Sequence, residues 1–160
     1  MTAEERRRAR EMLDLQEGTG PVPVLAEGAA VALLAGARRI AIVGASPSPL
    51  RASNGVMAAL LRAGYACVPI NPTTPEVLGQ VTFPTLEAAT AATGRFDIVD
   101  VFRRDEHLPA IARSAVTTGA GALWLQLGVV SWEAARVAHD GGLPVVMDRC
   151  TAIDLRRIPR

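Results

Sequence analysis

Small, hydroxyl-bearing and basic residues directly follow the apolar runs of this 160-residue chain. The first clear case is the run 39–43, which ends at Gly44 and continues with hydroxyl groups at Ser46 and Ser48. Backbone N–H groups left free at the start of a helix bind anions, and arginine binds phosphate oxygens through paired hydrogen bonds. Residues of these types therefore predict a site for a phosphate-bearing ligand.

Five segments of this kind occur, and each follows an expected strand. They are 44–48, 71–73, 102–104, 126–128 and 148–150. In an open parallel sheet, ligands bind beyond the carboxyl ends of the strands, where the strand order reverses. We therefore expect the ligand site at the edge of the sheet where these segments lie.

Several other kinds of chemistry lack the residues that they need. All 17 basic residues are arginine, which excludes a Schiff base, a lysine general base and a phosphate-loop lysine. His107 and His139 have no catalytic or metal-binding partner at a recognisable spacing. Because the sequence shows no catalytic constellation, we expect no enzyme activity unless the chain acts with a partner subunit.

A nicotinamide-dinucleotide site is the alternative interpretation of the same segments. The first expected strand is followed by GASPSPL, which is not the G-x-G-x-x-G fingerprint of dinucleotide-binding proteins. The second is followed by Asn71, where an NAD site often has an acid for the ribose hydroxyls. These departures weaken the hypothesis of an NAD(P)-dependent oxidoreductase without excluding it.

The overall charge and the cysteine content limit the partners and the compartment. The formal net charge is +1, so no strong field favours nucleic acid. No apolar run reaches the roughly 20 residues that span a bilayer, and no signal peptide is evident. Cys67 and Cys150 have neither metal nor disulfide spacing, which fits reduced thiols. We therefore expect a cytoplasmic protein that binds neither nucleic acid nor membrane.

The elements that must position these segments alternate along the chain. Apolar runs predict strands at 39–43, 65–70, 96–101, 121–126 and 144–147, and a short one at 81–83. Helical patterns lie between them, and Ser53 or Asn54 is expected to cap the helix after the first strand. Asp100 lies inside one apolar run, and we expect an arginine to pair with this buried acid.

This alternation predicts an α/β fold. We expect a Rossmann-like, doubly wound, mainly parallel sheet of five to six strands with helices on both faces, preceded by an N-terminal helix. The chain divides into a helical arm over 1–36, the main domain over 37–153 and a tail over 154–160. Aromatic residues make up only 4% of the chain, so the core must consist mainly of Ala, Val, Leu and Ile.

Five short motifs, in this order, resemble the stand-alone CoA-binding domain family. They are IVGAS at 42–46, VPINP at 68–72, VDVFRR at 99–104, ALWLQLG at 122–128 and VMDRC at 146–150. That family is similar to the amino-terminal CoA-binding domain of the succinyl-CoA synthetase α subunit. The resemblance covers 37–153 and implies a CoA-binding Rossmann-like domain.

The resemblance also implies a set of binding residues. Around the CoA phosphates and adenosine it places Gly44, Ala45, Ser46, Pro47 and Ser48. On the next loop it places Asn71 and Pro72, and beside the adenine or pantetheine it places Val101, Phe102 and Arg103. Two further candidates come from position alone. Arg51 shares the first loop and is otherwise a surface residue, while Cys150 either approaches the pantetheine thiol or is a small buried residue.

The chain also differs from the synthetase subunit and from the family pattern. The synthetase subunit has a lysine in the loop after the second strand, where this chain has Thr73 and Thr74. Thr151 stands where the family often has proline. The second synthetase domain, which carries the phosphorylated histidine, is missing, so the resemblance implies binding without ligase chemistry.

We therefore expect a non-catalytic protein that binds CoA or acyl-CoA for sensing, carrying or regulation. An NAD(P)-dependent oxidoreductase and a subunit of an acyl-CoA ligase are the alternatives. A third hypothesis is an interaction protein whose N-terminal helix is the working surface. A homodimer and an unidentified protein partner both stay open.

Overall fold

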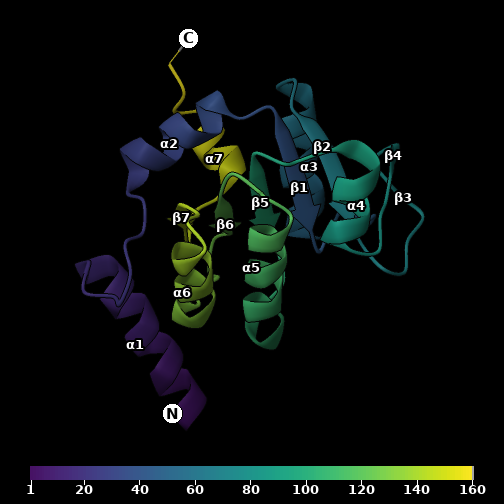
Figure 1. Ribbon diagram of the computed structural model, residues 1–160. Coiled ribbons are helices and arrows are strands. Elements are labelled where there is room, and N and C mark those ends of the chain that lie inside the picture. The colour runs from purple at the N-terminus through teal and green to yellow at the C-terminus, as the bar shows by residue number, and fades with distance from the viewer. Residues whose placement is uncertain (160) are drawn as a thin grey trace.

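A five-stranded parallel sheet forms the centre of the computed structural model, which describes residues 1–159 apart from the side chain of Asp105 (Figure 1). The strands are β1 (Arg39–Val43), β2 (Ala66–Ile70), β5 (Ile98–Val101), β6 (Leu123–Leu125) and β7 (Val145–Val146). Their order is β2-β1-β5-β6-β7. The order reverses between β1 and β5, which confirms the expected Rossmann-like topology.

Helices cover both faces of the sheet. One face packs on α2 (Glu27–Gly36), α3 (Ala52–Arg62) and α7 (Thr151–Leu155), and the other on α4 (Leu86–Thr93), α5 (Leu108–Thr117) and α6 (Trp132–Asp140). Strand residues alternate between the two cores, so Ile40 and Ile42 face α2 and α3, whereas Ala41 and Val43 face α4 and α5. Fully buried alanines such as Ala112 and Ala135 let the helices approach closely, as the aromatic-poor composition predicts.

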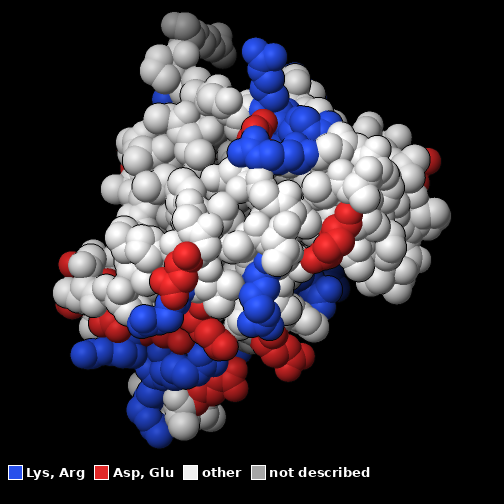
Figure 2. All heavy atoms as spheres, in the orientation of Figure 1, with Lys and Arg blue, Asp and Glu red and all other residues white. Residues whose placement is uncertain are grey.

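The expected helical arm over 1–36 contains two helices. Helix α2 packs on the sheet, so only α1 (Ala3–Glu17) is an arm, and its capping box joins Thr2 and Glu5. None of its residues is buried, and Figure 2 shows acidic and basic side chains gathered over it. Trp132, at the start of α6, holds the arm by donating its indole N–H to the carbonyl of Glu11 at 3.1 Å. The segment after the arm runs along the sheet edge, where the Leu25 N–H donates to the Val145 carbonyl at 2.8 Å.

The helix after β1 begins differently from the prediction. Its N-cap is Arg51, which makes no side-chain cap, and Ser53 and Asn54 lie buried inside the first turn. Their side chains bind the preceding loop instead, through both the N–H and the carbonyl of Ser46. The capping prediction is therefore wrong because these two side chains point toward the site loop.

The short strand expected at 81–83 is part of a small hairpin. Its strands are β3 (Glu76–Val77) and β4 (Gln80–Val81), and Phe83 forms a bridge to Ile70 beside it. The hairpin lies next to β2 at one end of the sheet (Figure 1). The main sheet therefore has five strands, the lower of the two expected numbers.

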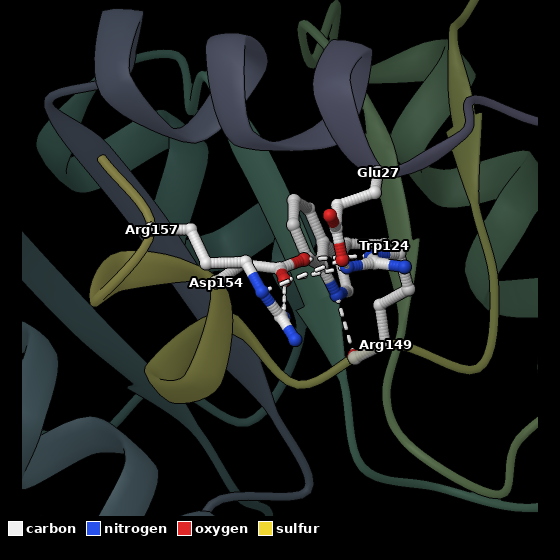
Figure 3. A network of polar contacts seen from close by, with 5 residues as sticks. All are labelled: Glu27, Trp124, Arg149, Asp154 and Arg157. Atoms are coloured by element: carbon white, nitrogen blue, oxygen red, sulfur yellow. Dashed lines mark hydrogen bonds and ion pairs between the residues drawn. The ribbon is translucent and has the colours of Figure 1, made fainter. Parts of the chain in front are cut away.

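The C-terminal residues form more structure than a tail. Helix α7 crosses the expected boundary after residue 153, and Asp154 is 1% exposed. Its carboxylate accepts two hydrogen bonds from Arg149 at 2.7 Å and one from Arg157 at 2.7 Å (Figure 3). Arg149 also pairs with Glu27 of α2 at 3.1 Å, so the network fastens α7 to α2. Arg160, the last residue of the expected tail, lies outside the described residues.

A short 3₁₀ helix, η1 (Asp105–His107), joins β5 to α5. Within residues 1–159, no helix has both the length and the apolar character needed to cross a bilayer.

Candidate functional site

A hollow of about 910 Å³ lies beyond the carboxyl ends of β1, β2 and β5. Three loops form it: the loop from β1 to α3, the loop after β2 and the loop after β5. It contains most of the residues expected from the sequence, namely Gly44, Ala45, Ser46, Arg51, Asn71, Pro72, Phe102 and Arg103. The remaining lining residues are Leu50, Ala52, Ser53, Thr73 and Arg104.

The first loop is held in shape by its own hydrogen bonds. Gly44 has a φ of +83°, a conformation that glycine adopts without strain. The N–H of Ser46 donates to the Ser53 hydroxyl at 3.1 Å, and the N–H of Ser48 donates to the Ser46 hydroxyl at 3.1 Å. Because each serine oxygen only accepts in these contacts, the hydroxyl proton of Ser46 is available to a ligand oxygen.

Asn71 joins the first two loops. Its side-chain N–H donates to the carbonyl of Ala45 at 2.8 Å. Its side-chain oxygen accepts from the N–H of Thr73 at 2.8 Å and of Thr74 at 3.2 Å. The side chain thus positions the loops around the hollow.

Arg103 lies across Gly44. A Cβ added at Gly44 would be 2.9 Å from Cδ of Arg103, so the absence of a side chain at Gly44 is what admits the arginine stem. Among the side chains that the structure describes, which do not include that of Asp105, none forms an ion pair or a hydrogen bond with the guanidinium of Arg103. The same holds for Arg51 and Arg104, which line the same hollow. Three unpaired cations around one hollow make it attractive to an anion.

Four of the expected site residues do not line the hollow. Pro47 and Ser48 belong to the first loop but lie outside the lining. Val101 is fully buried in the core under α4 and α5. Cys150 follows β7, packs half-buried against the core on the α2 side and does not line the hollow. The residue after it, Thr151, reaches across β6 to Asp100 of β5.

Asp100 has different partners from those expected. It is fully buried in β5 and accepts hydrogen bonds from Gln126 Nε2 at 2.6 Å and Thr151 Oγ1 at 2.9 Å. The expected pairing with arginine is wrong, because the side chain points to the α7 face while Arg103 and Arg104 lie beyond the strand end. Burial raises the pKa of the Asp100 carboxyl to about 7, although the hydrogen bonds from Gln126 and Thr151 act to lower it.

Leu50, Ala52 and Ser53 are lining residues outside the expected segments, and Leu50 is the large apolar one among them. Its side chain is 94% exposed at the rim of the hollow. An isolated large apolar residue inside the Ser- and Pro-containing loop is the signal that points to it. In the part of the chain that the structure describes, His, Cys, Asp and Glu side chains form no cluster suited to a metal ion.

Comparison with known proteins adds a family and a set of relatives. A family model described as "CoA binding domain" matches residues 38–156. The chain is 40% identical over 121 residues to the uncharacterized protein YneT of Bacillus subtilis (strain 168), a match that covers 76% of this chain and 87% of that protein.

Solved structures give the same picture of the fold. A hypothetical protein from Pyrococcus horikoshii OT3 is 32% identical, with a TM-score of 0.78, and the match covers 84% of this chain and 92% of that one. The dinucleotide forming acetyl-coenzyme A synthetase 1 of Ca. Korarchaeum cryptofilum, in its apo form, is 22% identical with a TM-score of 0.60. That match covers 69% of this chain and 26% of the synthetase, and it concerns the fold alone.

Proposed function

The chain belongs to the CoA-binding domain family, and we propose that it binds coenzyme A or an acyl-CoA without catalysing a reaction of its own. Its role would be to sense, carry or deliver the ligand, or to regulate a partner protein. We place it in the cytoplasm, where its thiols stay reduced.

The unpaired guanidinium of Arg103 is the observation that carries this proposal. CoA has a diphosphate and a 3′-phosphate, and a ligand with this much negative charge needs cations at fixed positions. Arg103, in the loop after β5, lies over Gly44 of the loop after β1, with Arg51 and Arg104 on the same hollow. Arginine binds phosphate oxygens in pairs, so these side chains supply the charge that the missing lysine would have given.

The remaining lining residues complement the other parts of CoA. The backbone of Gly44 and Ala45 lets the diphosphate approach closely, and the Ser46 hydroxyl donates to it. Leu50 and Phe102 offer apolar surface to the adenine or the pantetheine arm. Cys150 is left out of the proposed site because it does not line the hollow.

The composition of the hollow supports binding without catalysis. Its lining has hydroxyl, amide, guanidinium and apolar groups, with no carboxylate, histidine or thiol among the described residues. We expect an acyl-CoA to be recovered unchanged after long incubation with an equal amount of protein, as measured by chromatography. Hydrolysis or acyl transfer beyond the rate in buffer would contradict this part of the proposal.

Isothermal titration calorimetry with CoA tests the proposal directly. We expect Arg103→Gln to weaken CoA binding by about 10- to 100-fold, the range for loss of a charged hydrogen bond. The binding should also depend less on salt, because one phosphate contact is gone. Arg136→Gln is the matched control, since Arg136 is an exposed arginine on α6 away from the hollow.

Two results would overturn the proposal. The first is a wild-type protein that does not bind CoA at low salt. The second is NAD binding more tightly than CoA in a competition measured by saturation-transfer NMR.

A further inference from the structure

A second, smaller hollow of about 300 Å³ lies on the other side of Arg103. It is formed between the starts of α4 and α5, which lie on the same face of the sheet (Figure 1). A volume of this size is at the lower end of the range for small-molecule pockets. None of the function proposed above requires this space.

The two hollows adjoin each other. Gly44, Pro72 and Arg103 belong to the lining of both. The aliphatic part of the Arg103 side chain lies over Gly44 at this boundary. The apolar part of a ligand can therefore lie along this aliphatic part while its phosphates contact the guanidinium. A molecule that is charged at one end and apolar at the other fits this pair of hollows.

The second hollow is apolar at its base. Val43 and Ile70 come from the strand ends, and Leu86 and Ile111 come from the two helices. Each methylene group that leaves water for such a surface strengthens binding by about fourfold. The base therefore favours a hydrocarbon chain.

The rim of the second hollow is acidic. Glu87 and Glu106 are exposed at its edge, and Arg103 is the only arginine in the lining as described. If Arg103 is occupied by phosphate, the basic side chain left in this lining is His107, whose Nε2 already lies 3.7 Å from Glu106 Oε1, and the two glutamates repel a second carboxylate. A dicarboxylic acyl group is therefore disfavoured there.

We propose that the second hollow binds the acyl chain of a short-chain acyl-CoA whose acyl group carries no charge. The inference rests on the proposed CoA-binding function and specifies its ligand class. Free CoA would leave the apolar base in contact with water, and a dicarboxylic acyl-CoA would place a carboxylate beside Glu87 and Glu106.

Calorimetric titration of the wild-type chain with CoA, butyryl-CoA and succinyl-CoA tests this inference. We expect butyryl-CoA to bind at least tenfold more tightly than CoA, and succinyl-CoA to bind no more tightly than CoA. Equal affinities for CoA and butyryl-CoA, or a preference for succinyl-CoA, would overturn the inference. A wild-type chain that binds none of the three overturns the proposed function itself, so the two failures are distinct.

Variants then locate the effect. Ala110 is an exposed residue of α5 that lines the second hollow, so Ala110→Phe should fill it and reduce the ratio of the two affinities to near one. Ala91→Phe, at an exposed alanine of α4 outside both hollows, should keep the ratio. As an independent measurement, the double variant Glu87→Gln and Glu106→Gln should bind succinyl-CoA more tightly than the wild type does. An unchanged ratio in Ala110→Phe together with unchanged succinyl-CoA affinity would contradict the assignment of the hollow.

Discussion

At the scale of single residues, position 44 requires glycine for two reasons. Its φ of +83° is unfavourable for a residue with a Cβ, and its face is covered by the side chain of Arg103. A change at this position therefore alters both the loop and the arginine proposed to hold phosphate.

We predict that Gly44→Ala lowers the free energy of unfolding by about 1–3 kcal/mol, because the strained φ and the close contact add. CoA binding should weaken as well, since Arg103 must move away. Urea unfolding and calorimetry measure the two effects. Gly55→Ala is the control, because Gly55 lies in α3 with open space around it, and it should stabilise the protein by about 0.5–1 kcal/mol. A Gly44→Ala variant as stable as the wild type would contradict this account.

Asp100 gives a prediction about pH. Burial raises the pKa of its carboxyl to about 7 from an ordinary value of 3.8. Between these values the folded state binds more protons than the unfolded state, so this residue lowers the stability as the pH rises. Its contribution is most favourable below about pH 4 and is constant again above about pH 7.

The substitution Asp100→Asn isolates this effect, because its amide N–H takes the place of the carboxyl proton. We expect the stability of the wild type relative to the variant to fall by about 2–4 kcal/mol from pH 4 to pH 8. Urea unfolding at several pH values measures the difference. Parallel curves for the two proteins would show that the carboxyl does not titrate in this range.

At the scale of elements, α7 depends on one buried carboxylate. Asp154 accepts hydrogen bonds from Arg149 and Arg157, and Trp124 donates its indole N–H to the Arg149 carbonyl at 2.8 Å (Figure 3). A five-residue helix is too short to be stable alone, so these contacts hold it against the sheet.

We predict that Asp154→Ala lowers the free energy of unfolding by about 2–3 kcal/mol. The loss is below that for a fully buried pair because both arginines are partly exposed. Glu27→Gln, a change at a residue whose side chain is 57% exposed, should lower it by less than about 1 kcal/mol. Thermal and urea unfolding compare the two variants. Equal losses of stability in the two variants would mean that the buried carboxylate of Asp154 contributes no more than the exposed one of Glu27.

The elements also show what a single sequence can predict. Strand β1 was expected over the residues that form it, because a strand buried on both faces is a short apolar run that can be seen locally. The loops of the hollow were expected for the same reason, since each follows such a run.

What could not be predicted depends on contacts between distant residues. The partners of Asp100 lie 26 and 51 residues further along the chain. Ser53 and Asn54 are common capping residues, yet here they bind Ser46 in the preceding loop. The second hollow depends on how α4 and α5 are placed relative to each other, which no local pattern specifies.

At the scale of the whole molecule, the arm is attached through few contacts. The indole of Trp132 lies beside Gly20 and donates to Glu11, while α1 itself has no buried residue. Leu15 of α1 packs partly buried against the core on the α4 to α6 face, and the other members of both cores and the lining of the hollow lie outside α1.

We predict that removal of residues 1–19 lowers the melting temperature by less than about 5 °C, because little apolar surface is lost. CoA affinity should stay within about twofold of the wild type. The fluorescence of Trp132 should shift to the red, while fully buried Trp124 serves as an internal reference. Unfolding of the shortened chain, or loss of CoA binding, would show that the arm is part of the body. Light scattering on both proteins tests whether the arm holds two copies together.

The two outer strands of the sheet are both covered in part. On β7, the Val145 carbonyl accepts a hydrogen bond from the Leu25 N–H. Beside β2, the N–H of Phe83 donates to the Pro69 carbonyl, and its carbonyl accepts from the N–H of Asn71. Pro69 itself has no N–H to offer. Both outer strands therefore offer a neighbouring molecule an incomplete set of free backbone N–H and carbonyl groups. The sheets of two molecules are therefore hindered from pairing edge to edge, which is how exposed strands start fibrils.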